Sequence, residues 1–414
     1  MKRKLFTMLL TGSATLALTA QQTVNFSMGT NYTNDVYYSL PGGVIKTEPA
    51  QNWHLAFTVR PIDASIMINE AAGVKAYLAS NNVADWPTLD TAGMLNNQLH
   101  NSSESWELGA FANLGTSHPD YGWGEYNQIT HNVNASRIFV IELNDGSFRK
   151  FIVDEMNATA QTFTFRLADL DGSNEITHTV AKTNYAGKNF FYYDILADQF
   201  LDREPLSSEW DLVARRYDIE IPAGPMTFHY IVGGVQTNLE VKSAEVRGTI
   251  VTPADSVKYV LTDDDISNIG SDWKSFDNST FQWSIVDSLS YFVSSNSGGI
   301  YHIRFTDFGG SATGDIEFIQ SPEQSIGLDD FTSFALLPYP NPAIDRVSLP
   351  LAGLKGEVQL QLIDLNGRVV KSARTNAVLS TTEFEMTLND IPSGTYIIHL
   401  VNEHINYSTR IQIH

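Results

Sequence analysis

The sequence predicts an all-β protein made of two related antiparallel β units followed by a C-terminal β-sandwich. Short segments rich in Phe, Tyr, Val, Ile and Thr recur along the 414 residues, separated by clusters of Gly, Asn and Asp, and helical periodicity is scarce. A set of landmarks repeats at nearly constant spacing, which is typical of an internal duplication. The balance of charge changes near residue 337, which indicates a domain boundary.

The first 20 residues have the composition of a secretory signal peptide. Lys2, Arg3 and Lys4 precede an apolar stretch over residues 5–18, and Ala20 provides a small residue for cleavage. A membrane anchor is the alternative, but a span takes about 20 continuous apolar residues and this stretch is shorter. No cysteine is present to accept a lipid, and no later run is long enough to be a transmembrane segment. We therefore expect an exported, soluble protein.

Composition and motifs exclude several functions. The chain has 26 Lys and Arg against 47 Asp and Glu, a net charge of -21, and so acidic a surface repels nucleic acid and anionic lipid. The absence of cysteine excludes disulfides, thiolate zinc sites and iron–sulfur clusters. No Gly-x-Ser-x-Gly elbow or His-Glu-x-x-His helix occurs. We expect a protein that is not an enzyme.

Three landmarks of the body occur twice, in the same order. They are an aromatic strand, a Glu-Pro pair and a strand that opens with tryptophan: Val36–Leu40, Glu48-Pro49 and Trp53–Phe57 in the first copy, and Phe191–Ile195, Glu204-Pro205 and Trp210–Val213 in the second. The offsets between the copies are 155, 156 and 157 residues. A large aromatic side chain dominates burial energetics, so we expect Trp53 and Trp210 to lie in the cores of their units.

A fourth match joins residues 138–143 to residues 300–305, at an offset of 162. Both segments have a period of two, which places Phe139, Ile141 and Leu143 on one face and Tyr301, Ile303 and Phe305 on the equivalent face of the other copy. A hairpin signal follows each segment. Coincidence between generic β patterns is the alternative, but four matches in order favour duplication. The sequence thus predicts a first β unit at residues 21–183 and a second at residues 184–322.

The C-terminal segment differs from the body in its charge. Residues 337–414 carry 6 Lys and Arg against 7 Asp and Glu, whereas residues 21–336 carry 17 against 40. We expect a linker at residues 323–336 and a compact sandwich after it.

Three motifs follow one another in this segment: Tyr339–Ala343 (Tyr-Pro-Asn-Pro-Ala), Asp364–Val370 (Asp-x-x-Gly-Arg-x-Val) and Ser393–Tyr396 (Ser-Gly-Thr-Tyr). Together they resemble the type A C-terminal sorting domain of the type IX secretion system. The resemblance implies an immunoglobulin-like sandwich that interacts with the secretion machinery and takes the protein across the outer membrane. It also implies a final location on the cell surface or outside the cell.

One stretch of the body carries a second resemblance. Trp210–Asp218, followed by the Gly-rich turn at Gly233–Asn238, resembles the HmuY family of secreted haem-binding proteins. The resemblance extends over residues 30–320 as two units and implies an all-β fold with haem held between two histidines. Members of the best-studied kind are lipoproteins, and this chain departs from them because it has no lipid-accepting cysteine.

The haem hypothesis selects residues 81–131, where histidines and aromatic residues gather. We name His100 and His131 as the ligand pair, with His118 or Met94 as substitutes. The second copy has no histidine between positions 229 and 302, so we expect no haem site there. Aromatic residues that would line the slot are Trp86, Trp106, Tyr121, Trp123 and Tyr126. The alternative is that these are solvated loop histidines and packing tryptophans.

A weaker metal signal lies at Asp169, Asp171 and Asn174, whose oxygens fall at spacings that suit Ca²⁺. A polar β-turn is the alternative explanation. Two further functions remain as rivals to haem binding. One is a structural or adhesive surface protein without a small ligand. The other is a glycan-binding module that uses Trp86, Trp106 and Trp123 as stacking platforms.

Overall fold

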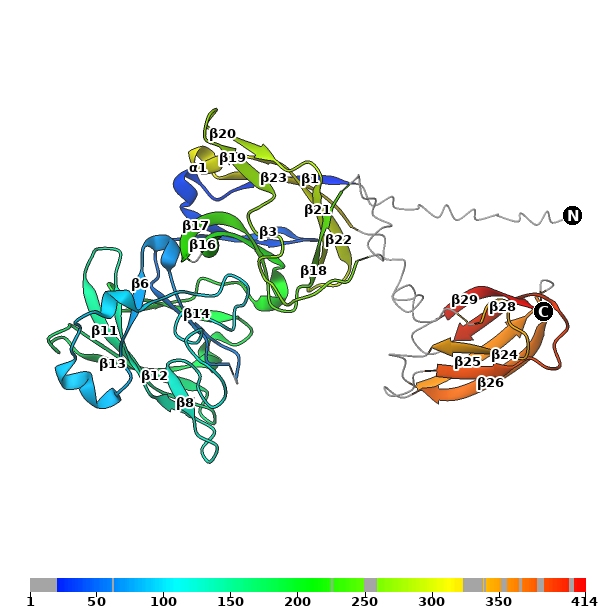
Figure 1. The fold of residues 1–414 in the computed structure, drawn as a ribbon, viewed down its shortest axis with the longest axis horizontal. Coiled ribbons are helices and arrows are strands. Elements are labelled where there is room, and N and C mark those ends of the chain that lie inside the picture. Colours follow the sequence, from blue (N-terminus) through cyan, green and yellow to red (C-terminus); the bar gives the residue numbers. More distant parts are fainter. Residues whose placement is uncertain are drawn as a thin grey trace, which may run out of the picture. The chain divides into compact units, whose positions relative to one another are not determined.

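The computed structural model describes residues 21–61, 63–224, 226–248, 259–322, 338, 340–350, 356–364, 367–377, 383–401 and 406–414. The chain divides into two compact units, residues 1–322 and 323–414. Their described parts consist of antiparallel sheets with one four-residue α-helix, α1 (Gly310–Thr313), which confirms the all-β prediction (Figure 1). The expected signal peptide and linker lie outside the described residues. No helix among those residues has the length and apolarity needed to cross a bilayer.

The first unit has two lobes, and the first lobe joins two sheets around one core. An eight-stranded sheet contains the path β13-β12-β11-β10-β6-β7, with β8 and β9 beside it, and a four-stranded sheet has the order β15-β14-β4-β5. The bounds are β4 (Leu55–Thr58), β5 (Ile66–Ile68), β6 (Lys75–Ser80), β7 (Gln98–Leu99), β8 (Gly124–Tyr126), β9 (Val133–Ala135), β10 (Ile138–Glu142), β11 (Phe148–Asn157), β12 (Thr162–Ala168), β13 (Ile176–Ala181), β14 (Phe190–Asp194) and β15 (Gln199–Leu201).

The second lobe repeats this plan with fewer strands. A five-stranded sheet has the order β1-β23-β22-β21-β18, and a four-stranded sheet has the order β17-β16-β2-β3. Figure 1 shows the blue N-terminal strands beside the yellow-green strands of this lobe. The bounds are β1 (Gln22–Ser27), β2 (Asn34–Ser39), β3 (Gly43–Pro49), β16 (Leu212–Ala223), β17 (Met226–Thr237), β18 (Ser243–Arg247), β19 (Lys274–Asp277), β20 (Gln282–Ile285), β21 (Leu289–Ser294), β22 (Ile300–Phe308) and β23 (Asp315–Pro322).

Short 3-10 helices occupy several connections of the first unit. They are η1 (Thr30–Tyr32), η2 (Glu70–Ala72), η3 (Val83–Thr88), η4 (Met94–Asn96), η5 (Lys182–Tyr185) and η6 (Ser207–Glu209). The helix η2 begins with Glu70, whose carboxylate lies at the candidate site described below. Its ends are well defined, because the Asn69 side chain accepts a hydrogen bond from the Ala72 amide and Gly73 follows with a φ of 91°.

The two copies of the duplication exchange strands. In the first lobe β4 of the first copy pairs with β14 of the second, and in the second lobe β16 of the second copy pairs with β2 of the first. The two pairings have the same register. Leu55 and Leu212 each lie two residues after the landmark tryptophan, and they lie opposite Tyr193 and Tyr38, respectively. Each lobe therefore takes strands from both predicted ranges, and the boundary at residues 183–184 does not separate two bodies.

The sheet orders also correct one of the sequence matches. The series β6-β10-β11-β12-β13 corresponds to β18-β21-β22-β23-β1, so residues 138–142 correspond to residues 289–294. The bulge between Val153 and Glu155 of β11 has its counterpart between Phe305 and Asp307 of β22. The match to residues 300–305 is therefore wrong by one strand. Neighbouring strands of one sheet share the same alternation, so the pattern alone does not distinguish them.

The junction between the lobes keeps the symmetry of the duplication in its aromatic contacts. Trp53 meets Tyr192 edge-on, with ring centroids 5.1 Å apart and an interplanar angle of 79°. Trp210 meets Tyr37 at 5.1 Å and 78°. Both tryptophans are buried, at 1% and 2% exposure, so the expectation that they are core residues is confirmed. They lie in one cluster between the lobes and not in two separate cores.

Backbone hydrogen bonds at the junction repeat the same symmetry with different side chains. The Leu40 amide donates to Asp211 Oδ2 over 2.7 Å, and the Ile195 amide donates to His54 Nδ1 over 3.1 Å. Asp211 follows Trp210 and His54 follows Trp53, and each of them accepts a hydrogen bond from the backbone amide at the end of the neighbouring aromatic strand. The duplication is consequently visible in hydrogen bonding even where the residue types differ.

The second unit is a two-sheet β-sandwich with its own core. One sheet pairs β24 with β27, and the other has the order β26-β25-β28-β29. Its bounds are β24 (Arg346–Pro350), β25 (Gly356–Ile363), β26 (Val369–Ala377), β27 (Glu383–Thr387), β28 (Gly394–Val401) and β29 (Asn406–Ile413).

The sequence motifs of the second unit have structural roles. Asn341, in the Tyr-Pro-Asn-Pro motif, accepts from the Gln412 amide over 2.9 Å and donates to the Arg410 carbonyl over 3.2 Å, which attaches the motif to β29. In the second motif, Gly367 has a φ of 82° and its amide donates to Asp364, closing the hairpin between β25 and β26. Both motifs are thus structural parts of one sandwich.

Candidate metal centre

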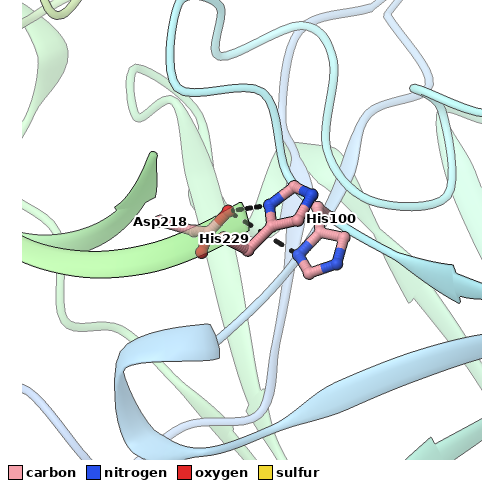
Figure 2. A group of neighbouring side chains, drawn as sticks. All are labelled: His100, Asp218 and His229. Carbon is pink, nitrogen blue, oxygen red and sulfur yellow. Dashed lines mark hydrogen bonds and ion pairs between the residues drawn. The ribbon is translucent and has the colours of Figure 1, made fainter. Parts of the chain in front are cut away.

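Three side chains with metal-ligand chemistry meet in the first unit, namely His100, Asp218 and His229 (Figure 2). Their ligand atoms all lie within 4.8 Å of one another. Nδ1 of His229 is 2.5 Å from Asp218 Oδ2, and Nδ1 of His100 is 3.6 Å from the same oxygen. The two imidazole rings are parallel within 7°, with centroids 3.3 Å apart. One carboxylate oxygen therefore faces a nitrogen from each of two stacked rings.

Strand register places two of the three residues together. Asp218 lies on β16 opposite Ile231, and His229 lies on β17 opposite Glu220. Side chains alternate between the faces of a strand, so Asp218 and His229 are diagonal neighbours on one face of this hairpin. Asp218 is buried, whereas the His229 side chain is 28% exposed. The site is thus open to solvent on the histidine side.

The third residue comes from the first lobe. His100 follows β7, and its Nδ1 is 2.8 Å from Oε1 of Glu70, the first residue of η2. The other oxygen of Glu70 accepts a hydrogen bond of 2.7 Å from the Asn101 side chain. Asn101 is itself fixed by Ile68, whose amide donates to its Oδ1. Glu70 and His100 are therefore held in place by the edge of the first lobe, facing the hairpin of the second.

Burial raises the pKa of the Glu70 carboxyl, and the nearby charge of Asp218 raises it further. Hydrogen bonds from His100 and the Asn101 amide act in the opposite direction. Two carboxylates are thus held near each other in a partly desolvated place, at an electrostatic cost. A divalent cation between them would remove that cost, because it neutralises both charges.

The donor set suits a first-row transition metal. Two imidazole nitrogens with one or two carboxylate oxygens are typical ligands of zinc, iron, manganese or nickel, whereas calcium and magnesium prefer all-oxygen sites. Ligand atoms that share one ion at roughly 2.1 Å lie about 3 Å or more from one another. The 3.6 Å between His100 Nδ1 and Asp218 Oδ2 meets this condition, whereas the contacts of 2.5 and 2.8 Å are hydrogen bonds between these side chains.

The cluster is built from the parts in which the two copies differ. The hairpin β16–β17 has 12 residues in each strand, whereas its counterparts β4 and β5 have 4 and 3. His100 lies in the long connection between β6 and β10, and the corresponding connection of the second copy carries β19 and β20 instead. The symmetric scaffold thus supports a site that occurs once among the residues that the structure describes.

The other histidines named for haem lie elsewhere. His118 packs against Tyr126 with ring centroids 5.2 Å apart, and His131 Nδ1 is 2.6 Å from the Tyr126 hydroxyl. Both histidines are exposed, and Tyr121 lies beside the same group. His100 has Glu70, Asp218 and His229 as its neighbours, so the structure gives the two members of the named pair different surroundings.

The remaining residues named for a ligand are part of the packing. Met94 is 9% exposed and lies in a cluster with Tyr77 and Val140. The tryptophans are each 5% exposed or less, and their indole nitrogens donate to Glu175, the Thr237 carbonyl and the Ala64 carbonyl for Trp86, Trp106 and Trp123 respectively. Rings buried in this way offer no platform to a glycan at the surface.

The acidic turn named for calcium is occupied by its own hydrogen bonds. The Ser173 amide donates to Asp171 Oδ1 over 2.8 Å, and Asn174 Nδ2 donates to Asp169 Oδ2 over 2.6 Å. Arg149 forms an ion pair with Asp169 at 3.0 Å. The polar turn accounts for these contacts without a cation.

Sequence reasoning missed Glu70, Asp218 and His229. A signal for two of them exists in the sequence. Asp218 and His229 lie almost symmetrically about the turn signal at Gly224-Pro225, in the middle of a long alternating run. A hairpin centred on that turn places them within diagonal reach.

Comparisons with known proteins identify the second unit. Residues 338–414 match the family model of the secretion system C-terminal sorting domain. The protein is therefore exported by the type IX secretion system, across the outer membrane, to the cell surface or the outside.

Other comparisons add little. No curated protein matches the chain. Among solved structures, the crystal structure of dimeric latent PorU from Porphyromonas gingivalis is similar over 69% of this chain, with 9% sequence identity and a TM-score of 0.19. This chain covers 31% of that one. A likeness of this degree carries no argument about fold or function.

Proposed function

We propose that the first unit is a metal-binding protein delivered outside the cell, and that it takes a divalent transition-metal ion between His100, Asp218 and His229. The observation that carries this proposal is the convergence of two imidazole nitrogens on one buried carboxylate. Glu70 would serve as a fourth ligand or would hold His100 in place. The export of the protein agrees with capture of metal outside the cell.

Binding of Co²⁺ to the purified, tag-free chain tests the proposal, because Co²⁺ in a histidine and carboxylate site absorbs visible light. We expect one equivalent to bind and Zn²⁺ to displace it, while Ca²⁺ and Mg²⁺ do not. The substitution His229→Ala removes a ligand, so affinity should fall by roughly 100-fold or more. The fold should persist, since His229 lies at a solvent-exposed edge of the site.

A matched control removes a histidine elsewhere. His131→Ala deletes an exposed imidazole whose described partner is Tyr126, so Co²⁺ affinity should stay at the wild-type value. Equal losses in His131→Ala and His229→Ala would indicate diffuse surface binding and contradict the proposal. So would wild-type protein that binds no Co²⁺ at micromolar concentrations.

Haem binding in the manner of the HmuY family is a second candidate function. One observation favours it, namely that His118 and His131 both lie against Tyr126 in an exposed group of loops. The sequence resemblance over residues 30–320 supports it as well. In this version the ligands would be His118 and His131, and His100 would belong to the metal site.

Haem titration followed at the Soret band separates the two candidates. If the protein carries haem, the wild type should give a saturable Soret shift that the double substitution His118→Ala, His131→Ala abolishes. His100→Ala should leave the shift unchanged if the ligands are those of the loop group. A wild-type protein without any Soret change, with oxidised and with reduced haem, would exclude this candidate and leave the metal site untouched.

A further inference from the structure

A small pocket adjoins the candidate metal centre and shares two of its carboxylates, Glu70 and Asp218. Its lining also includes two consecutive arginines, Arg215 and Arg216, together with polar side chains from both lobes. Neither arginine forms an ion pair within the part of the chain that the structure describes. Arg215 also lines a second pocket together with the buried Glu204, so Arg216 is the positive side chain beside the cation site that requires an explanation.

The two arginines reach the pocket in different ways. Arg216 and Asp218 are two positions apart on β16 and share a face of the strand, and an Arg216 nitrogen is 3.5 Å from the Ala71 carbonyl in η2. Arg216 therefore extends across the pocket toward the helix that carries Glu70. Arg215 lies on the opposite face of the strand, where it is only 9% exposed and its guanidinium lies over the rings of Trp53 and Trp106. Arg216 is therefore the arginine that shares a face with Asp218 and lies beside the candidate metal centre.

Charge indicates when an anion would bind beside Arg216. Glu70 and Asp218 carry two negative charges and Arg216 carries one positive charge, so the formal charge on this side is -1 when no metal is bound. A divalent ion adds two positive charges to this partly buried place, and an anion that follows the metal would offset them. Three protein ligands also leave at least one coordination position open on a metal of this type.

We propose that the site binds a metal together with a small oxyanion or carboxylate, which bridges the metal and the guanidinium of Arg216. The inference rests on the proposed metal-binding function. The ligand of the site is then a metal–anion pair and not a bare ion. Binding of the two components is then mutually reinforcing, because each raises the affinity of the other by the same factor.

Acetate is the probe, added to the full chain loaded with Co²⁺ while the visible band is followed. We expect a saturable spectral change, and we expect acetate to tighten Co²⁺ binding. Arg216→Gln should weaken acetate binding about tenfold or more, because one charge-assisted hydrogen bond is lost. The same substitution should leave Co²⁺ affinity without acetate unchanged or slightly higher, since it removes a cation beside the metal. Arg216→Lys keeps the charge and should lie between the two.

The control is Arg304→Gln, which makes the same change on β22, outside the pocket lining. It should bind acetate and Co²⁺ like the wild type. If Co²⁺ binds to the wild type but acetate causes no change, or if Arg216→Gln and Arg304→Gln behave alike, the anion inference is wrong and the metal function stands. If Co²⁺ does not bind at all, both fall together.

Discussion

Removal of residues 337–414 should abolish delivery to the cell surface and leave the first unit folded inside the periplasm. The reason is the division of the molecule into two compact units, each with its own hydrophobic core, of which only the second matches the sorting domain. Labelling of intact cells with an antibody against the first unit measures the effect. We expect nearly all surface signal to disappear while the periplasmic fraction gains soluble, protease-resistant protein.

The full-length variant His229→Ala is the control for this experiment, because it alters the first unit and keeps the sorting domain. It should reach the surface at the wild-type level. Surface signal from the truncated chain at the wild-type level would show that export does not depend on the second unit. Complete degradation of the truncated chain would contradict the independence of the two units.

Replacement of Trp53 or Trp210 by alanine should destabilise the first unit by about 3–5 kcal/mol each. Both rings are almost fully buried in the cluster between the lobes, and each contacts a tyrosine of its own lobe edge-on. Truncation would leave a large cavity at a place that fixes the two lobes to each other. Such a loss is a large part of the 5–15 kcal/mol that stabilises a typical domain. Urea unfolding followed by circular dichroism measures it.

A matched control for these substitutions is Trp283→Ala. Trp283 is 38% exposed on the β19–β20 hairpin, so its removal should cost far less. The double variant of Trp53 and Trp210 should deviate from additivity, because both belong to the same buried cluster. Two large effects that add without coupling would show that the tryptophans stabilise separate regions, and the description of a shared junction would be wrong.

Local pattern was enough to predict much of the fold. Alternation of apolar and polar residues, turn signals and the scarcity of helical periodicity predicted an all-β chain, and the repeated tryptophans predicted two buried rings. The motifs at the C-terminus predicted the sorting domain, which the family match bears out. These features depend on neighbours in sequence, and a single sequence contains that information.

Partner choice between strands was not predictable in the same way. Alternation determines which face of a strand is apolar, but it does not determine which other strand lies beside it. The exchange of β4 and β16 between the copies, and the shift of one strand in the match to residues 300–305, both follow from this limit. The candidate site is a further case, because His100 comes from one copy and Asp218 and His229 from the other. No spacing along the chain relates them.

The exchange of strands has a consequence for the nascent chain. The first lobe consists of one continuous stretch, residues 55–201, so a growing polypeptide contains all of it long before synthesis ends. The second lobe pairs β1 with β23, and it joins Gln22 to Gln320 over 298 positions of sequence. Contacts of such high contact order form slowly, so we expect closure of this sheet to be a late event of folding. The sorting domain follows β23 in sequence, and the ribosome therefore makes the export signal only after the last strand needed for that closure.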